Sequence, residues 1–303
     1  MKMDALSLDQ FRVFNTVVET GSFSAAARKL NRAQSAITYT VQRLEEQVGA
    51  DLFDRSGYRP VLSEAGRALL PRVRRILDEV AGFALQAHGI AGGLEPELSL
   101  VVESMFPMRR LTEALSDFQA QFPSVQTRLY VETLGAAVQA LLDGAADLGV
   151  VTVFASDFPE LERAPAGDFE LTPVAAPEHP LARAEGLLET DALRDHTQLV
   201  LTDRSALTAG KDFGVAALRT WRIADLGAKH AMLLAGLGWG SMPLHMVSAD
   251  LEAGRLARLR VKAWDGADQM PRLSTVVAHR RDHALGPAGR WLRARLTEDA
   301  RAG

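Results

Sequence analysis

A row of hydrogen-bonding side chains on one face of a predicted helix is the strongest chemical signal in the chain. The helix is expected from about Ala33 to Val48, with apolar residues at the i, i+4, i+8, i+11 spacing of a packed face. Amide and hydroxyl groups can bond base edges in a DNA major groove, and a ring can pack on a thymine methyl. A solvated helix surface explains these side chains equally well. The row comprises Gln34, Ser35, Thr38, Tyr39 and Gln42.

The elements around this helix predict a winged helix-turn-helix. An apolar stripe over residues 8–18 indicates a first helix ending at Gly21, and small residues over 25–30 indicate a short second helix. Asn31 suits the turn that follows, because asparagine tolerates left-handed backbone. Residues 52–62 predict two short strands around a turn, which would form the wing. This succession favours base recognition over a solvated surface.

Basic side chains are expected to hold the phosphate backbone beside the third helix. Two arginines of the predicted wing could contact phosphates, which fixes the register on the duplex without specifying sequence. The predicted DNA-binding residues are Arg32, Gln34, Ser35, Thr38, Tyr39, Gln42, Arg43, Arg55 and Arg59.

A heptad pattern predicts a long helix from Ser63 to about Ala87. The helix could pack on its own domain, but its arginine-rich opposite side favours a seam between two copies of the chain. Pro71 predicts a kink or a lost backbone hydrogen bond near Arg67, and a glycine-rich stretch over 89–96 predicts a hinge. The predicted dimerisation residues are Leu69, Val73, Ile76, Val80 and Phe83.

From Glu97 onward the chain alternates strand-like and helix-like segments, which predicts βαβ units in a parallel sheet. Ligands of such sheets bind beyond the carboxyl ends of the strands. The Ser104 hydroxyl and the N–H groups of a helix beginning at Pro107 would suit an anion or a carbonyl oxygen, unless this is an ordinary serine-capped loop. Thr152 and Thr202, near the ends of two other strands, are further candidates, although threonine is also a common strand former.

Composition limits the classes of function. A chain of 303 residues predicts two or three domains of an ordinary soluble protein. The formal net charge is -4, but residues 1–90 hold 12 Lys/Arg and 10 Asp/Glu, whereas residues 91–303 hold 22 and 28. The positive excess therefore lies where a DNA-binding patch would be useful. The absence of cysteine excludes disulfides, thiol redox sensing, cysteine nucleophiles and cysteine zinc sites.

Location and catalysis are constrained by missing signals. The N-terminus lacks the pattern of a signal peptide, so a cytoplasmic protein is expected. The longest nearly apolar window, 231–244, is shorter than the roughly 20 residues of a membrane span, so no membrane partner is expected. An enzyme is the main rival, yet the chain has no nucleophile elbow, phosphate loop or assignable acid–base pair. His279 and His283 lack the helix and glutamate of a zinc hydrolase, so neither a metal nor a cofactor is expected.

The N-terminal motif resembles that of the LysR-type transcriptional regulators. Beyond the predicted hinge the likeness covers nearly the whole chain. The matching positions are Ala26-Ala27, Leu30, Ala33-Gln34-Ser35-Ala36-Ile37-Thr38, Val41, Leu44-Glu45, Gly49, Leu52-Phe53, Arg55, Leu62-Ser63-Glu64-Ala65-Gly66, Leu111, Phe118, Phe122-Pro123, Asp147-Leu148-Gly149-Val150 and Ala235-Gly236-Leu237-Gly238-Trp239-Gly240-Ser241-Met242-Pro243.

The resemblance implies a mixed α+β and α/β fold in three parts. Residues 1–65 would form a winged helix-turn-helix, residues 66–90 a dimerising linker helix, and residues 91–303 an effector domain similar to periplasmic solute-binding proteins. In that domain the chain crosses twice between two α/β subdomains, expected over about 91–164 with 268–303 and over about 165–267. A small molecule would bind in the cleft between them.

The expected cleft departs from the family at one position, and the wing at another. Leu134 stands where many members have a threonine or serine lining the cleft, which argues against an effector anchored there by a carboxylate. Tyr58 stands in the wing where relatives often carry arginine. The expected effector-binding residues are Ser104, Met105, Phe106, Pro107, Leu134, Thr152, Thr202 and Trp239. Packing in the protein core explains Met105, Phe106 and Trp239 at least as well.

The implied function is transcriptional regulation. A homodimer or homotetramer would bind double-stranded promoter DNA, respond to a small-molecule effector and contact RNA polymerase. Closure of the two subdomains on the effector would change DNA bending through a population shift. A cytoplasmic solute-binding or sensor protein with only weak DNA binding is the alternative, and the fused N-terminal DNA module argues against it.

Overall fold

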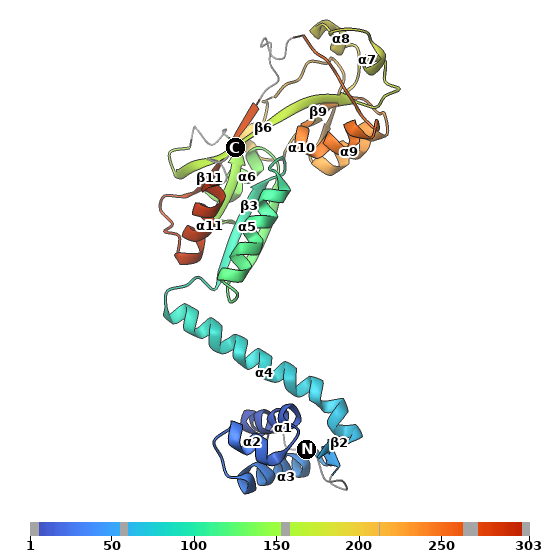
Figure 1. Cartoon of the computed structure of the whole chain (residues 1–303). Helices are drawn as coiled ribbons and strands as arrows, with labels where there is room; N and C mark the ends of the chain where they lie inside the picture. The colour runs from blue at the N-terminus through green and yellow to red at the C-terminus, as the bar shows by residue number, and fades with distance from the viewer. Residues whose placement is uncertain (1–5, 55–59, 153–157, 212, 263–271, 299–303) are drawn as a thin grey trace. The chain divides into compact units, whose positions relative to one another are not determined.

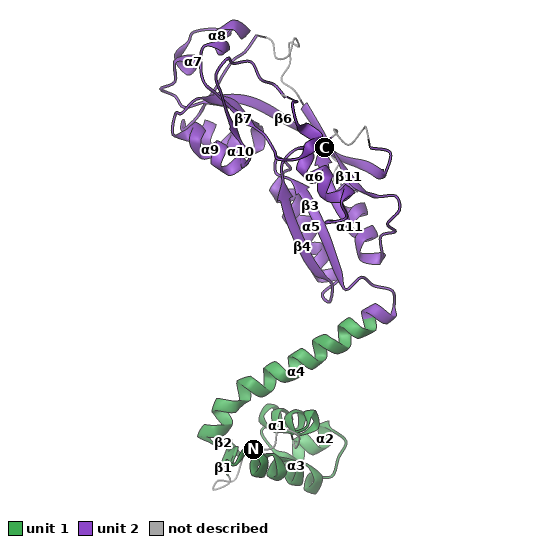
Figure 2. Ribbon diagram, turned by 180° about the vertical axis from the view of Figure 1, so that it is seen from behind, with its two compact units in different colours: residues 1–88 green, residues 89–303 purple. Residues whose placement is uncertain are grey.

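The computed structural model of the chain describes residues 6–54, 60–152, 158–211, 213–262 and 272–298. The chain divides into two compact units, residues 1–88 and 89–303 (Figure 2). Within the described ranges, no helix is both long enough and apolar enough to cross a bilayer.

The first unit contains three short helices, a two-stranded wing and most of a long helix (Figure 1). Local signals set the helix ends: Ser7 and Gln10 form a capping box, and Gly21, Asn31 and Gly49 adopt left-handed backbone with φ of 68°, 52° and 73°. The predicted conformations of Gly21 and Asn31 are thereby confirmed. The elements are α1 (Leu8–Thr20), α2 (Phe23–Lys29), α3 (Gln34–Val48), β1 (Phe53–Asp54), β2 (Val61–Leu62) and α4 (Glu64–Ala91).

The core of this unit joins the helices to the wing. The Phe53 ring, at the start of the wing, lies 5.4 Å from the rings of both Phe14 and Phe23. The nearly buried Glu45 carboxylate on α3 accepts the backbone N–H groups of Leu52 and Phe53 at 2.8 and 3.2 Å. These bonds fix β1 against α3, so the wing is held by the helix that carries the polar row.

The long helix differs from its prediction at the C-terminal end. It continues to Ala91, so Gly89 lies within the helix and the turn follows at Gly93, whose φ is 79°. Pro71 lies inside the helix, where it provides no N–H for the Arg67 carbonyl.

The second unit is built on one mixed sheet with the strand order β4-β3-β5-β11-β6-β9-β7-β8. Strands β4, β3 and β5 are parallel, as are β8, β7 and β9, which agrees with the predicted βαβ units. The strands are β3 (Glu97–Glu103), β4 (Gln126–Glu132), β5 (Leu148–Thr152), β6 (Leu161–Ala175), β7 (Gln198–Leu201), β8 (Thr220–Ile223), β9 (Trp239–Pro243), β10 (Ala257–Arg258) and β11 (Arg272–Arg280).

Two antiparallel strands in the middle of this sheet were not foreseen as a pair. Strand β6 pairs with β11 as far as Glu170 and with β9 from Leu171, so it continues from one half of the sheet into the other (Figure 1). The change of partner falls later than the boundary expected near residue 165. Strand β10 pairs with the end of β6.

The two halves of the sheet define two lobes. Lobe I contains β3, β4, β5 and the helices α5 (Met108–Gln121), α6 (Gly135–Leu142) and α11 (Pro287–Glu298). Lobe II contains β7, β8, β9 and the helices α7 (Pro180–Arg183), α8 (Thr190–Arg194), α9 (Leu226–Leu234) and α10 (Leu244–Glu252), with a 3-10 turn at Ala206–Thr208. The carboxyl ends of β3 and β4 and the start of α9 therefore become candidates for one ligand cleft.

Candidate DNA interface and ligand cleft

The polar row lies on the exposed side of α3. Gln34, Ser35 and Gln42 are exposed, and Tyr39 is 63% exposed. On the opposite side, Ile37, Val41 and Leu44 are buried in the core of the unit. The backbone therefore presents amide, hydroxyl and phenol groups to solvent along one helix face.

Three other candidates in this region already have intramolecular partners. The Thr38 hydroxyl donates to the Gln34 carbonyl at 3.0 Å. The guanidinium of Arg32 is paired with Asp9, and that of Arg43 with Glu46, both at 2.8 Å. These surface pairs are weak, so DNA phosphates can compete for both arginines. Arg55 and Arg59, like Tyr58 and the predicted wing turn, lie outside the described residues.

The start of α3 offers further groups to a phosphate. Its N-cap is Ala33, which provides no side-chain acceptor for the first N–H groups. An open groove of about 610 Å³ runs beside it, lined by side chains that include Ser24, Arg28 and Arg32. Ser24 and Arg28 were not predicted as DNA-binding residues, because α2 appeared in sequence only as a packing helix.

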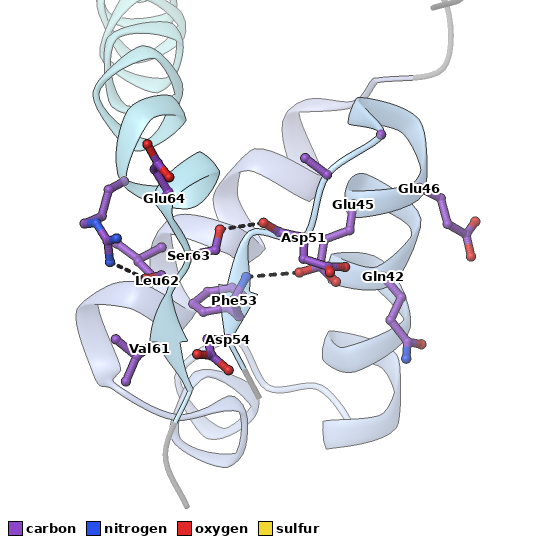
Figure 3. A pocket seen from close by; sticks show the side chains of 13 residues that line it. Gln42, Glu45, Glu46, Asp51, Phe53, Asp54, Val61, Leu62, Ser63 and Glu64 are labelled. Atoms are coloured by element: carbon purple, nitrogen blue, oxygen red, sulfur yellow. Dashed lines mark hydrogen bonds between the residues drawn. The ribbon is translucent and has the colours of Figure 1, made fainter. Parts of the chain in front are cut away.

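The C-terminal half of α3 faces an acidic groove. Figure 3 shows this groove between α3 and the wing, with Gln42 directed away from the wing strands. It has a volume of about 1080 Å³. Arg67 also lines the groove, but the carboxylates outnumber it, and carboxylates repel DNA phosphates. The acidic lining residues are Glu45, Glu46, Asp51, Asp54 and Glu64.

The predicted dimerisation seam on α4 divides into two parts. Val73 is buried and packs into the core of the winged helix, as the own-domain interpretation expects. Leu69, Ile76 and Val80 are partly exposed, and Phe83 is 73% exposed. An apolar face therefore extends along the helix beyond the first unit's own core.

A cavity of about 680 Å³ lies between the two lobes, and we call it the cleft cavity. Lobe I supplies the end of β3, the start of α5 and the end of β4, and lobe II supplies the starts of α9 and α10. Its wall is partly apolar, and two carboxylates, of Glu132 and Asp225, also face it. Other lining residues include Ser104, Phe106, Pro107, Thr133, Leu226 and Met246.

Two hydroxyl groups that line this cavity, those of Ser104 and Thr133, link lobe I to lobe II. The Ser104 hydroxyl donates to Oε1 of Glu103 at 3.1 Å and lies 3.3 Å from Oγ1 of Thr133. Thr133 Oγ1 in turn donates to the carbonyl of Ala224 in lobe II at 3.4 Å. A ligand that bonds either hydroxyl therefore acts on a contact between the lobes.

Beneath these hydroxyls, Glu103 is fully buried. Burial raises the pKa of its carboxyl to about 7, against the opposing effect of hydrogen bonds from Ser104 and the Leu134 N–H. No sequence pattern singles out this group, because the burial of Glu103 at the end of β3 arises from tertiary structure.

A cationic group also borders the cavity. Arg110 donates from Nη1 to the Ala166 carbonyl at 2.8 Å, and its guanidinium lies 5.2 Å from the centroid of the Phe106 ring. Its Nε and Nη2 atoms are buried and have no hydrogen-bond partner among the described residues. The neighbouring Arg109 also lines the cavity, but its side chain is exposed and paired with Glu113.

Four of the expected effector-binding residues lie in the protein interior. Met105 and Leu134 belong to an apolar cluster with residues of lobe II. Thr152 is buried on β5, and Trp239 is buried with its indole N–H donating to the His196 carbonyl. These side chains do not line the cleft cavity as the structure describes it.

Three further details differ from the sequence-based expectation. The hydroxyl thought missing at Leu134 is supplied one position earlier by Thr133, while Leu134 packs inward with a left-handed φ of 51°. Pro107 is the N-cap of α5 and not its first helical residue. Thr202 lies outside the cavity lining, and its hydroxyl donates to the Asp203 carbonyl at 3.4 Å.

Sequence comparison identifies both parts of the chain. Residues 8–67 match the bacterial regulatory helix-turn-helix protein, lysR family, and residues 91–301 match the LysR substrate binding domain. The HTH-type transcriptional regulator AceR of Acinetobacter baumannii is 31% identical over 294 residues, which cover 95% of each chain. The probable HTH-type transcriptional regulator YhaJ of Escherichia coli is 30% identical over 301 residues, covering 96% of this chain and 95% of its own.

Solved structures agree with this fold over the full length. A mutant of Corynebacterium glutamicum OxyR superimposes with a TM-score of 0.54 at 24% identity, covering 100% of this chain and 95% of that one. Full-length LysG of the same organism, with bound effector Arg, gives a TM-score of 0.51 at 19% identity and covers 98% and 99%. Matched over nearly its whole length, the chain belongs to the LysR family of DNA-binding transcriptional regulators with an effector-binding domain.

Proposed function

We propose that this regulator recognises promoter DNA through the N-terminal half of α3, as a homodimer or homotetramer in the cytoplasm. Base contacts come from Gln34, Ser35 and Tyr39, whose side chains are exposed together on one helix face. Phosphate contacts come from the uncapped start of α3 and from Arg28 and Arg32 beside it. Arg43, Arg55 and Arg59 remain candidates for the flanking phosphates.

The apolar face of α4 supports the oligomer. A half-exposed row of aliphatic side chains ending in Phe83 is costly in water and suits a second copy of the same helix. A dimer places two α3 helices on one duplex, which matches the two-fold symmetry common in DNA half-sites. Contact with RNA polymerase is part of the same proposal.

The effector binds in the cleft cavity, and the cross-lobe hydroxyl chain is the observation that carries this assignment. Ser104 and Thr133 offer hydroxyls at the end of parallel strands, and the half-buried Met246 adds apolar surface beside the buried Phe106 and Leu226. Arg110 adds positive charge, while Glu132 and Asp225 add negative charge. The cavity therefore suits a small, partly apolar organic molecule with a polar end.

Binding there regulates DNA affinity only if the ligand prefers one arrangement of the lobes. Thr133 bonds lobe II directly, so a ligand that takes over its hydroxyl changes the free-energy difference between closed and open lobes. The change then reaches the DNA through the oligomer.

A metabolite screen by thermal shift, followed by mobility-shift assays on the upstream region of the protein's own gene, tests this function. A ligand that raises the melting temperature should alter the DNA complex of the wild type but not that of Ser104→Ala. Thr112→Ala is the matched control, because its hydroxyl is bonded to the Arg109 carbonyl within α5. An equal response of Ser104→Ala and the wild type would remove Ser104 from the effector site.

A further inference from the structure

A carboxylate from lobe II lies at the N-terminus of a helix in lobe I. Asp203 follows β7, and its Oδ2 accepts the N–H of Ala136 in the first turn of α6 at 2.7 Å. The N-cap of α6 is Leu134, which has no side-chain acceptor. A helix start carries unpaired N–H groups and partial positive charge, so it binds anions, and here the anion belongs to the protein.

The surrounding residues hold this carboxylate in place. Ser205 Oγ donates to Oδ2 of Asp203 at 3.0 Å, and Thr208 Oγ1 donates to Oδ1. Gly135 permits the close approach, because a Cβ there would lie 2.5 Å from Ser205 Oγ and 2.8 Å from Thr208 Cγ2. The helix start, the glycine and the two hydroxyls together form a complete carboxylate site. We call these residues the carboxylate latch: Asp203, Ser205, Thr208, Gly135 and Ala136.

The carboxylate latch lies next to the cleft cavity along the chain. Thr133 lines the cavity and bonds Ala224, and three residues later Ala136 bonds Asp203. Between them, Leu134 packs among apolar residues of lobe II. The short segment 133–136 therefore makes three kinds of contact across the lobes.

We propose that Asp203 is an internal ligand that occupies the anion position of α6 and holds the lobes closed without an effector. An anionic effector group cannot take that position while Asp203 fills it, so recognition falls to the hydroxyl and cation side of the cavity. The inference about which effector groups are excluded rests on the proposed function, whereas the inference that Asp203 holds the lobes closed does not.

The distance between the lobes is the direct test. Because the chain has no cysteine, Gln121→Cys in α5 and Glu252→Cys in α10, both at exposed positions, provide two unique labelling sites in the full chain. Single-molecule energy transfer, with labelled protein mixed into excess unlabelled protein, reports the distance within one copy. The measurement uses no DNA and no effector, so it stands even if the regulatory assignment fails.

Asp203→Ala should broaden the distribution of inter-lobe distances or shift it to longer distances, and sodium acetate should return it toward that of the wild type. Sodium chloride at the same ionic strength should not, because chloride cannot reproduce the two carboxylate oxygens. Gly135→Ala provides a second perturbation: alanine favours helix but its methyl group displaces Ser205 and Asp203, so the lobes should open in a stable protein.

Glu95→Ala is the matched control. The Glu95 carboxylate also caps a helix, accepting the N–H groups of Ala288 and Gly289 at 3.0 Å, but all three residues are outside lobe II. The distribution of inter-lobe distances in Glu95→Ala should equal that of the wild type. An unchanged distribution in both Asp203→Ala and Gly135→Ala would overturn the proposal, and so would recovery by chloride equal to that by acetate.

Discussion

Replacing Lys229 with methionine should stabilise the effector domain in a pH-dependent way. Lys229 lies on α9 and is 4% exposed, and its Nζ donates to the Ser241 carbonyl at 2.7 Å. Among the described residues it has no carboxylate partner at ion-pair distance. Burial of the ammonium group lowers its pKa from 10.5 to about 7.

The size of the effect follows from this pKa. Between pH 7 and 10.5 the unfolded chain binds the proton and the folded protein does not, so the free energy of unfolding rises with pH. The rise between pH 7 and 9 is about 2 kcal/mol. Methionine removes the charge but leaves the Ser241 carbonyl without a donor, at about 1–2 kcal/mol. The free energy of unfolding of Lys229→Met should therefore exceed that of the wild type by about 2–3 kcal/mol at pH 7 and differ from it by less than about 1 kcal/mol at pH 9.

Urea unfolding followed by tryptophan fluorescence measures this difference. The four tryptophans are Trp221, Trp239, Trp264 and Trp291, so the signal comes from the second unit alone. Lys262→Met is the control, since Lys262 is exposed and paired with Glu189, and it should change stability by less than about 0.5 kcal/mol at either pH. Parallel stability–pH curves for Lys229→Met and the wild type would refute the reasoning.

Three other substitutions test the remaining features. The wild type should lose stability as pH rises from 4.5 to 7, because the Glu103 carboxyl keeps its proton in the folded protein after the unfolded chain has lost it. Glu103→Gln should remove this loss, and at pH 8 its free energy of unfolding, measured by the same fluorescence assay, should exceed that of the wild type by up to about 3 kcal/mol. Gly66→Ala should destabilise the first unit by about 1–3 kcal/mol in denaturation followed by circular dichroism, because its methyl group would overlap the Leu52 carbonyl; wild-type stability would contradict this packing. Phe83→Glu should lower the oligomeric state in analytical ultracentrifugation, and an unchanged mass would remove Phe83 from the seam.

Much of the first unit was predictable because its signals are local. Gly21, Asn31 and Gly49 end or separate helices through backbone conformations that these residue types favour. The polar row on α3 was predictable for the same reason, since helical spacing alone assigns the faces. The acidic groove was not, because it combines the end of α3 with the wing.

The second unit was less predictable because its key contacts are non-local. Strand β6 contains Pro165 and Gly167, which are typical of loops, and it becomes a strand by pairing with β11 and β9. The inward packing of Leu134, next to the cleft, accompanies an unusual φ of 51°, which no sequence pattern predicts for leucine. Asp203 meets Ala136 only through tertiary structure.

The central claim, DNA recognition through the exposed face of α3, is tested most directly by comparing specific and random duplexes in a mobility-shift assay at fixed salt. Gln34→Ala should weaken binding to the upstream region of the protein's own gene by roughly 5- to 100-fold while leaving random DNA little changed. Thr40→Ala is the control, because its hydroxyl bonds the Ala36 carbonyl on a different side of the helix. Equal losses of Gln34→Ala on both duplexes, or no salt-sensitive and sequence-selective complex of the wild type, would contradict the account.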